Sequence, residues 1–78
     1  MKIEIGKHYL IRQRWQYGEQ KTDDIMVLKC IRAAEKNEIE LYRGTNGFIG
    51  ADVRDVEDNR PILKYFEDDE VISSIRID

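Results

Sequence analysis

Hydrophobic and polar positions alternate along much of this chain with a period of two. Successive side chains of a strand point to opposite faces, so this alternation predicts a half-buried first strand over residues 7–15, with a shorter alternating stretch before it at residues 3–5. Leu10 is the residue that interrupts the pattern. The apolar positions of this strand are Tyr9, Ile11 and Trp15, and the polar ones are His8, Arg12 and Arg14.

The next two segments differ sharply in polarity. Residues 16–24 are polar and include Gly18, and a connection of nine residues is long for a tight hairpin. We therefore predict an exposed loop there, which is a candidate for binding. Residues 25–34 are apolar on both parities until Lys29 and Arg32. This indicates a central strand that is covered on both faces for half its length.

The middle of the chain predicts a second hairpin. Residues 35–38 are polar and indicate a turn, and residues 39–43 alternate as in a half-buried strand. Asn46 and Gly47 can both adopt positive φ, so they favour a hairpin turn into a partner strand over residues 48–56. Residues 57–61 form a polar break that ends at Pro61.

The last third leaves two alternatives for its secondary structure. Residues 62–66 suit a brief strand or a single helical turn. Acidic residues 67–70 could begin a helix, but four β-branched aliphatic residues in 71–77 favour a closing strand. The pattern as a whole predicts an all-β domain: a small curved antiparallel sheet or barrel of five to six short strands, with a short helical turn near 62–66 or 67–75 left open.

One stretch of the chain resembles a known family. The run Gly47-Phe48-Ile49-Gly50-Ala51-Asp52-Val53 resembles the stretch that leads into the short helical turn and last strand of SH3-like domains. Residues 16–24 would then correspond to the long first loop of that family. The family's aromatic-rich opening motif, its paired tryptophans and its proline at the position of Gly50 have no counterpart here. The resemblance therefore implies a fold and no particular ligand.

Composition restricts the chain to one small folded domain. Its 78 residues are 41% hydrophobic and 37% charged, and the net charge of −3 differs from that of a strongly basic nucleic-acid binder. The single cysteine cannot form an intrachain disulfide, and the longest apolar run has four residues. We expect a single domain over residues 1–78, located in the cytoplasm, that does not enter a membrane.

The residue types needed for catalysis are sparse. His8 is the only histidine and lacks neighbours at metal-ligand spacing, so we interpret it as an ordinary strand residue. Cys30 lies within an apolar segment and is predicted to be a buried packing residue. Three glycines, at 44, 47 and 50, are not followed by the lysine of a phosphate loop, which indicates turn and bulge positions. We predict no catalytic set, no metal site and no cofactor.

Two groups of residues are candidates for binding. Arginine, tryptophan and tyrosine are enriched where a few residues dominate a protein interface, and they can also hold phosphates and bases. The first group is Arg12, Arg14, Trp15, Tyr17 and Tyr42. The second group is a candidate acidic contact surface, made of Asp52, Asp55, Glu57, Asp58, Glu67, Asp68, Asp69 and Glu70.

These groups favour a non-enzymatic protein–protein interaction module, such as an adaptor or a small inhibitor. The first alternative is a nucleic-acid-binding domain that uses the basic and aromatic face. The second alternative is an acidic inhibitor of a nucleic-acid enzyme, encoded by a phage or mobile element. An exposed edge strand could also pair with a second copy, so we expect a monomer or a weak homodimer.

Overall fold

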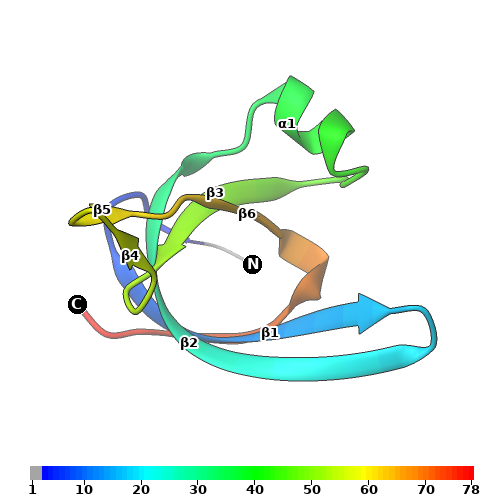
Figure 1. The fold of residues 1–78 in the computed structure, drawn as a ribbon, viewed down its shortest axis with the longest axis horizontal. Helices are drawn as coiled ribbons and strands as arrows, with labels where there is room; N and C mark the ends of the chain where they lie inside the picture. Colours follow the sequence, from blue (N-terminus) through cyan, green and yellow to red (C-terminus); the bar gives the residue numbers. More distant parts are fainter. Residues whose placement is uncertain (1–2) are drawn as a thin grey trace.

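The computed structural model describes residues 3–78, and most of them lie in β-strands (Figure 1). The predicted all-β class is confirmed. In chain order the elements are β1 (His8–Tyr17), β2 (Gln20–Ala33), α1 (Lys36–Leu41), β3 (Gly47–Asp52), β4 (Val56–Glu57), β5 (Arg60–Pro61), β6 (Lys64–Glu67), the 3-10 turn η1 (Asp68–Glu70) and β7 (Val71–Arg76).

Five of these strands form one curved antiparallel sheet. Their order is β6-β3-β2-β1-β7, so the last strand returns to lie beside the first. The pairing register shifts between Arg12 and Gln13 and again between Cys30 and Arg32, and such irregularities bend a sheet. Figure 1 shows the result: the long strand β2 curls so that β3 and β6 lie over β1. The concave face of this sheet encloses the core.

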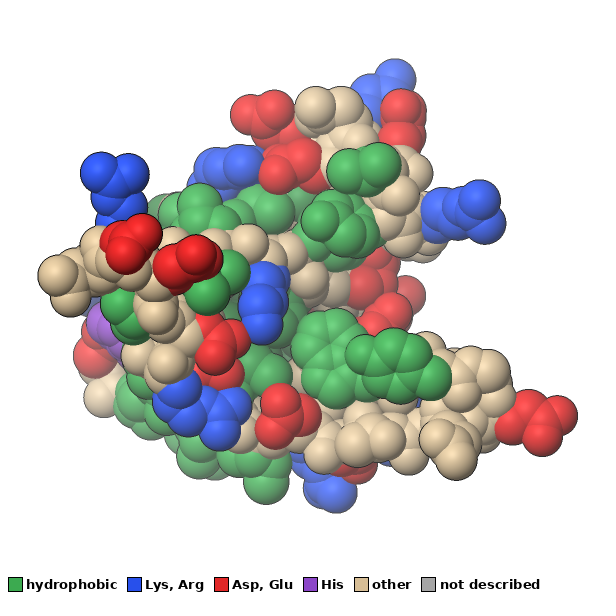
Figure 2. Space-filling model, in the orientation of Figure 1, with side chains coloured by type: hydrophobic (Ala, Val, Ile, Leu, Met, Phe, Trp, Pro, Cys, Tyr) green, Lys and Arg blue, Asp and Glu red, His purple; other side chains and the backbone are tan. Residues whose placement is uncertain are grey.

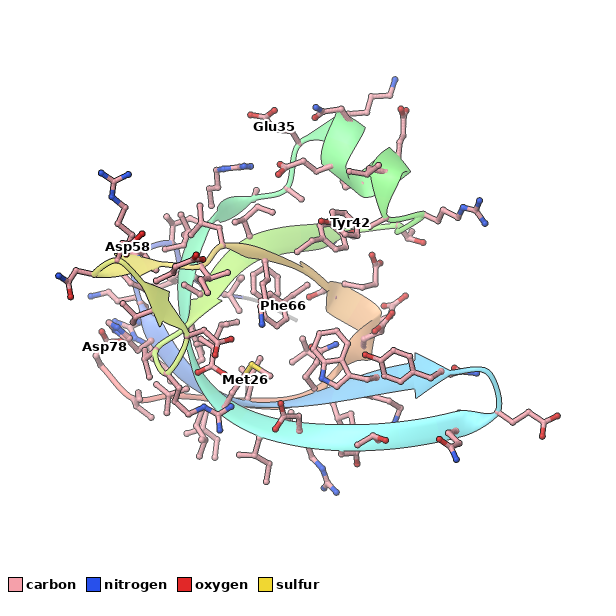
Figure 3. The ribbon with its side chains drawn as sticks, viewed as in Figure 1. Met26, Glu35, Tyr42, Asp58, Phe66 and Asp78 are labelled. Atoms are coloured by element: carbon pink, nitrogen blue, oxygen red, sulfur yellow. The ribbon has the colours of Figure 1, made fainter. Side chains whose placement is uncertain are left out.

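The core forms from the inward parity of the strands. Phe66 is 1% exposed and its ring stacks on Phe48, with ring centroids 5.5 Å apart. Figure 3 shows Phe66 and Met26 pointing into the space that the sheet encloses. The predicted parity of the first strand is confirmed. The buried cluster contains Tyr9, Ile11, Met26, Leu28, Cys30, Phe48 and Phe66, with Ile3, Trp15 and Val71 packed against it.

The predicted loop at residues 16–24 is wrong. These residues extend β1 and β2 into a hairpin arm, with Tyr17 paired with Gln20 across a two-residue turn. Gly18 makes the tight turn because it adopts a φ of 61°, which glycine tolerates at low cost. The arm extends beyond the core, so its strands need no apolar alternation. The polar side chains of the arm are explained by solvent on both faces of its two strands and not by a loop.

The predicted strand at residues 39–43 is also wrong, because α1 forms there. Glu35 and Glu38 make a capping box, in which each side chain accepts a hydrogen bond from the other residue's backbone. The helix ends where Arg43 takes a φ of 53° and Gly44 N donates to Ile39 O. These local hydrogen bonds favour the helix over the alternating pattern. The hairpin predicted at Asn46 and Gly47 is therefore absent, and these residues lead from α1 into β3.

The second half of the chain differs from the predictions mainly in its boundaries. β3 ends at Asp52, and the predicted polar break forms the short β4–β5 hairpin, whose turn residues Asp58 and Asn59 have positive φ. Of the alternatives for residues 62–66, the strand is observed, as β6. The favoured closing strand is confirmed as β7, with η1 immediately before it.

The predicted cover on both faces of the central strand is wrong at its start. β2 does lie in the middle of the sheet, but Ile25 is 61% exposed while Met26 is buried. The convex face of the sheet is therefore open to solvent at this strand.

Candidate functional site

A cleft surrounds Trp15 on the concave side of the sheet. Two hollows share this residue. The first, which we call the tyrosine hollow, measures about 360 Å³ and is lined by Trp15, Tyr42, Arg43, Gly44, Thr45, Tyr65, Glu67, Asp69 and Glu70. The second, the ion-pair hollow, measures about 390 Å³ and is lined by Trp15, Tyr17, Asp24, Met26, Asp52, Arg54, Asp55, Lys64 and Phe66. We call the two together the Trp15 cleft.

Packing against the core fixes the position of Trp15. Its indole lies 6.3 Å from the ring of Phe66, at an angle of 45°, and packs against the buried cluster. It follows Tyr9, Ile11 and Gln13 on the inward parity of β1, where the hairpin arm leaves the core. Figure 2 shows hydrophobic side chains on both sides of the recess between the hairpin arm and α1. The fold therefore presents a fixed aromatic surface at the mouth of the cleft.

A stacked pair of tyrosines lines the tyrosine hollow. The rings of Tyr42 and Tyr65 are nearly parallel, at 5°, with centroids 4.9 Å apart. Tyr65 fits there because Gly44 and Gly47 carry no side chain. A Cβ atom on either glycine would collide with the Tyr65 phenol. These glycines thus make room for a ring, whereas the sequence had indicated turn and bulge positions.

Glu67 connects Tyr65 to the loop before β3 through hydrogen bonds. One carboxylate oxygen accepts hydrogen bonds from the backbone N–H groups of Thr45 and Asn46, each at 3.0 Å. The other accepts the Tyr65 hydroxyl at 2.6 Å. Burial acts to raise the pKa of Glu67, but these hydrogen bonds outweigh it and lower the pKa. Burial and the bond to Glu67 both raise the pKa of Tyr65, so its phenol stays protonated and fixed.

An ion pair connects α1 to β2, and Tyr42 caps the C-terminal end of this helix. The guanidinium of Arg32 meets both carboxylate oxygens of Glu38, and its Nη2 lies 2.9 Å from Oε2. The Arg32 hydrogen bonds, together with the backbone N–H of Glu35, lower the pKa of Glu38 to about 2. A charged Glu38 therefore holds α1, which Tyr42 follows, against β2.

Acid should break the ion pair that connects α1 to β2. A carboxylate whose pKa is lowered on folding contributes stability above its unfolded pKa, and that contribution is lost as pH falls through the folded value. For Glu38 this window runs from its usual value of 4.5 down to about 2. We expect the backbone amide NMR signals of residues 35–42 to shift across this window. A Glu38→Gln variant should lose the step near pH 2 and a Glu40→Gln variant should keep it; a step near pH 2 in both would contradict the assignment.

The ion-pair hollow contains carboxylates that are already paired. Asp52 is 5% exposed and binds Arg54, with Oδ2 lying 2.7 Å from Nη2. These hydrogen bonds lower the pKa of Asp52 against the effect of burial. Lys64 Nζ lies 2.8 Å from Asp55 Oδ2. Tyr17, which is 72% exposed, forms part of the open side of this hollow.

The first candidate group is divided between the two faces of the sheet. Trp15, Tyr17 and Tyr42 all line the Trp15 cleft. Arg12 and Arg14 lie on the outward parity of β1, and Asp23 pairs with both, at 3.1 and 3.2 Å. Neighbouring residues of a strand point in opposite directions, so the cluster in the sequence is two surfaces in space.

The second candidate group is scattered in the same way. Glu67 is the carboxylate that supports Tyr65, while Asp69 and Glu70 line the tyrosine hollow and Asp68 precedes them in η1. Asp52 and Asp55 belong to the ion pairs described above. Glu57 and Asp58 lie on the β4–β5 hairpin, and Figure 3 shows Asp58 far from Tyr42. These residues do not form one continuous acidic surface.

The remaining reactive side chains lie elsewhere. His8 Nδ1 lies 2.7 Å from Asp78 Oδ2, outside the cleft. Cys30 is buried as predicted, and burial raises the pKa of its thiol to about 11. Within residues 3–78, no three His, Cys, Asp or Glu side chains are grouped to hold a metal ion. In the same part of the chain, no helix has the length and apolar character needed to span a membrane.

The sequence does not predict the role of Tyr65, which lines the cleft, or of Gln13, which is buried behind it. The sequence places Tyr65 only in a short apolar segment, and no local pattern distinguishes it from its neighbours. Gln13 is fully buried on the inward parity of β1. Its Nε2 approaches Glu70 Oε2 at 3.5 Å, and its Oε1 has no hydrogen-bond partner among the described residues. A glutamine in an otherwise apolar parity was the available signal for a polar site behind η1.

Comparison with known proteins gives no match: no family model, no curated protein and no solved structure is significantly similar to this chain.

Proposed function

We propose that the protein is a non-enzymatic interaction module that binds a segment of another protein in the Trp15 cleft. The observation that carries this proposal is the convergence of four aromatic residues on two hollows that share Trp15: Tyr42 and Tyr65 line one, and Tyr17 lines the other. Aromatic side chains are typical of residues that dominate protein interfaces. His8 and Cys30 lie outside the recess, which favours recognition over catalysis.

The charges near the cleft support a protein partner over a nucleic acid. A nucleic-acid site needs cations that are available to phosphates. Arg12 and Arg14 share Asp23, and within the cleft Arg54 and Lys64 pair with Asp52 and Asp55. The scattered positions of the acidic residues likewise give less support to an acidic inhibitor that mimics nucleic acid.

Peptide selection combined with NMR tests the proposal. Peptides selected from a displayed random library should shift the amide and indole signals of cleft residues in the intact protein. A Tyr17→Ala/Tyr42→Ala variant should bind them about tenfold or more weakly, as expected when interface anchors are truncated. The matched Arg12→Ala/Arg14→Ala variant, which changes the opposite face, should bind within about twofold of wild type.

The opposite pattern would overturn the proposal. If the arginine variant loses binding and the tyrosine variant does not, the convex face is the functional surface. Binding of an RNA or DNA oligonucleotide that weakens steeply with salt and requires Arg12 and Arg14 would establish the nucleic-acid alternative instead.

A further inference from the structure

The tyrosine hollow is negatively charged. Its lining includes three carboxylates, from Glu67, Asp69 and Glu70, against a single guanidinium from Arg43. The adjoining ion-pair hollow also has an excess of acid, with Asp24, Asp52 and Asp55 against Arg54 and Lys64. A recess with one sign of charge in excess attracts ligands of the opposite sign.

The aromatic rings of the same hollow also favour a positive charge. The face of a tryptophan or tyrosine ring carries partial negative charge and attracts ammonium and guanidinium groups. Trp15 is fixed against Phe66, and Tyr65 is fixed by Glu67 and the stacked ring of Tyr42. The rings therefore need little reorganisation when a cation enters, which favours binding.

The three carboxylates have two different roles. Glu67 supports Tyr65, whereas Asp69 and Glu70 face the ligand. Glu67 already accepts three hydrogen bonds, so its role is to position Tyr65 and the loop before β3. Asp69 and Glu70 are exposed at the rim, and Gln13 lies behind Glu70. These two side chains are placed to face a charge that lies against the rings.

We infer that the tyrosine hollow receives the side-chain cation of a basic segment of the partner protein, an arginine guanidinium or a lysine ammonium. The cation lies against Trp15 and the tyrosine pair and is balanced by Asp69 and Glu70. This inference rests on the proposed function, because it specifies the chemistry of the segment bound in the Trp15 cleft.

Trp15 provides a direct test because it is the only tryptophan in the chain. Its fluorescence is measured while the intact protein is titrated with short capped peptides that are identical except for a central arginine, lysine or norleucine. The cationic peptides should bind about tenfold more tightly than the norleucine peptide, the size expected for a partly desolvated cation–π contact with a carboxylate nearby.

Two matched pairs of variants test the aromatic ring and the carboxylates, each against a control for general effects on the structure. Tyr42→Leu should weaken the arginine peptide about tenfold, whereas Tyr42→Phe, which keeps the ring, should bind within about twofold of wild type. Asp69→Asn/Glu70→Gln should weaken the same peptide about fivefold. Glu57→Gln/Asp58→Asn removes the same charge from the distant β4–β5 hairpin and should leave binding unchanged. Tyr42 is 60% exposed and the four substituted carboxylates are also exposed, so these variants are expected to fold.

The possible results distinguish failure of the cation inference from failure of the proposed function. If the norleucine peptide binds equally well, or if Tyr42→Leu has no effect, the cation inference is overturned. If library selection yields neutral segments that shift cleft signals, the protein-binding function stands and the cation inference fails. If spermidine binds in the hollow while basic peptides do not, the assignment to a protein segment fails. If no peptide perturbs the cleft, both proposals fail.

Discussion

Replacing Phe66 with alanine should destabilise the domain by about 3–5 kcal/mol, the range measured for buried phenylalanines. Phe66 is 1% exposed, stacks on Phe48 and lies under Trp15, so the substitution would leave a cavity beneath the cleft. A chain of 78 residues has a total stability of about 4–12 kcal/mol. We therefore expect the variant to lose a large share of its stability, which would appear as a much lower midpoint of urea denaturation followed through Trp15 fluorescence.

Two companion variants make this expectation specific. Phe66→Leu keeps much of the buried volume and should cost less than Phe66→Ala. Tyr17→Ala removes an aromatic ring that is 72% exposed and should change the free energy of unfolding by less than about 0.5 kcal/mol. A Phe66→Ala variant as stable as Tyr17→Ala would show that the core is not centred on this ring.

The fold class followed from the sequence wherever a strand has one face on the core. In β1 the inward parity carries Tyr9 and Ile11, so the alternation correctly predicted which side chains are buried. The hairpin arm was missed because residues 16–24 extend past the core. A strand with solvent on both faces has no hydrophobic period, and its polar composition resembles that of a loop.

The helix at Lys36–Leu41 was missed because an alternating pattern is present where no strand forms. Residues 39–43 alternate over only five positions, which is too short a pattern to exclude a helical turn. Leu41 is 75% exposed and Tyr42 stacks on Tyr65 instead of entering the core, so the alternation does not describe burial here. Hydrogen bonds within residues 35–38, and from Arg32 to Glu38, determine the local structure.

The resemblance to SH3-like domains stays a prediction, as does a cytoplasmic location.

The candidate site was predictable in its residue types but not in its geometry. Trp15, Tyr17 and Tyr42 were selected as aromatic binding residues and share one cleft. Arg12 and Arg14 were grouped with them because they are close in sequence, although strand geometry sends them to the other face. Tyr65 could not be selected without knowing that the loop after α1 passes beside β6. Long-range packing of this kind is not encoded in a local pattern.

Gly47→Ala should dismantle the tyrosine hollow while the sheet remains folded. The backbone of Gly47 does not have positive φ, unlike those of Gly6 and Gly18, so alanine is compatible with its conformation. The added Cβ would instead overlap the Tyr65 ring and force it outward. Tyr65 would then lose its stacking on Tyr42 and its hydrogen bond to Glu67. We expect a loss of about 1–3 kcal/mol in stability, as for other overpacked sites, measured by chemical denaturation.

A double-mutant cycle decides whether this collision is the cause. In a Tyr65→Leu background the phenol is gone, so adding Gly47→Ala should cost much less than it does in the wild type, with a coupling energy above about 1 kcal/mol. Binding of the arginine peptide should fall both in Gly47→Ala and in Tyr42→Leu, because each substitution removes the stacked pair from the hollow. Additive effects of the two substitutions would mean that Gly47 is required for strand β3 itself. In that case the absence of a side chain at Gly47 would be required by the sheet and not by the ring of Tyr65.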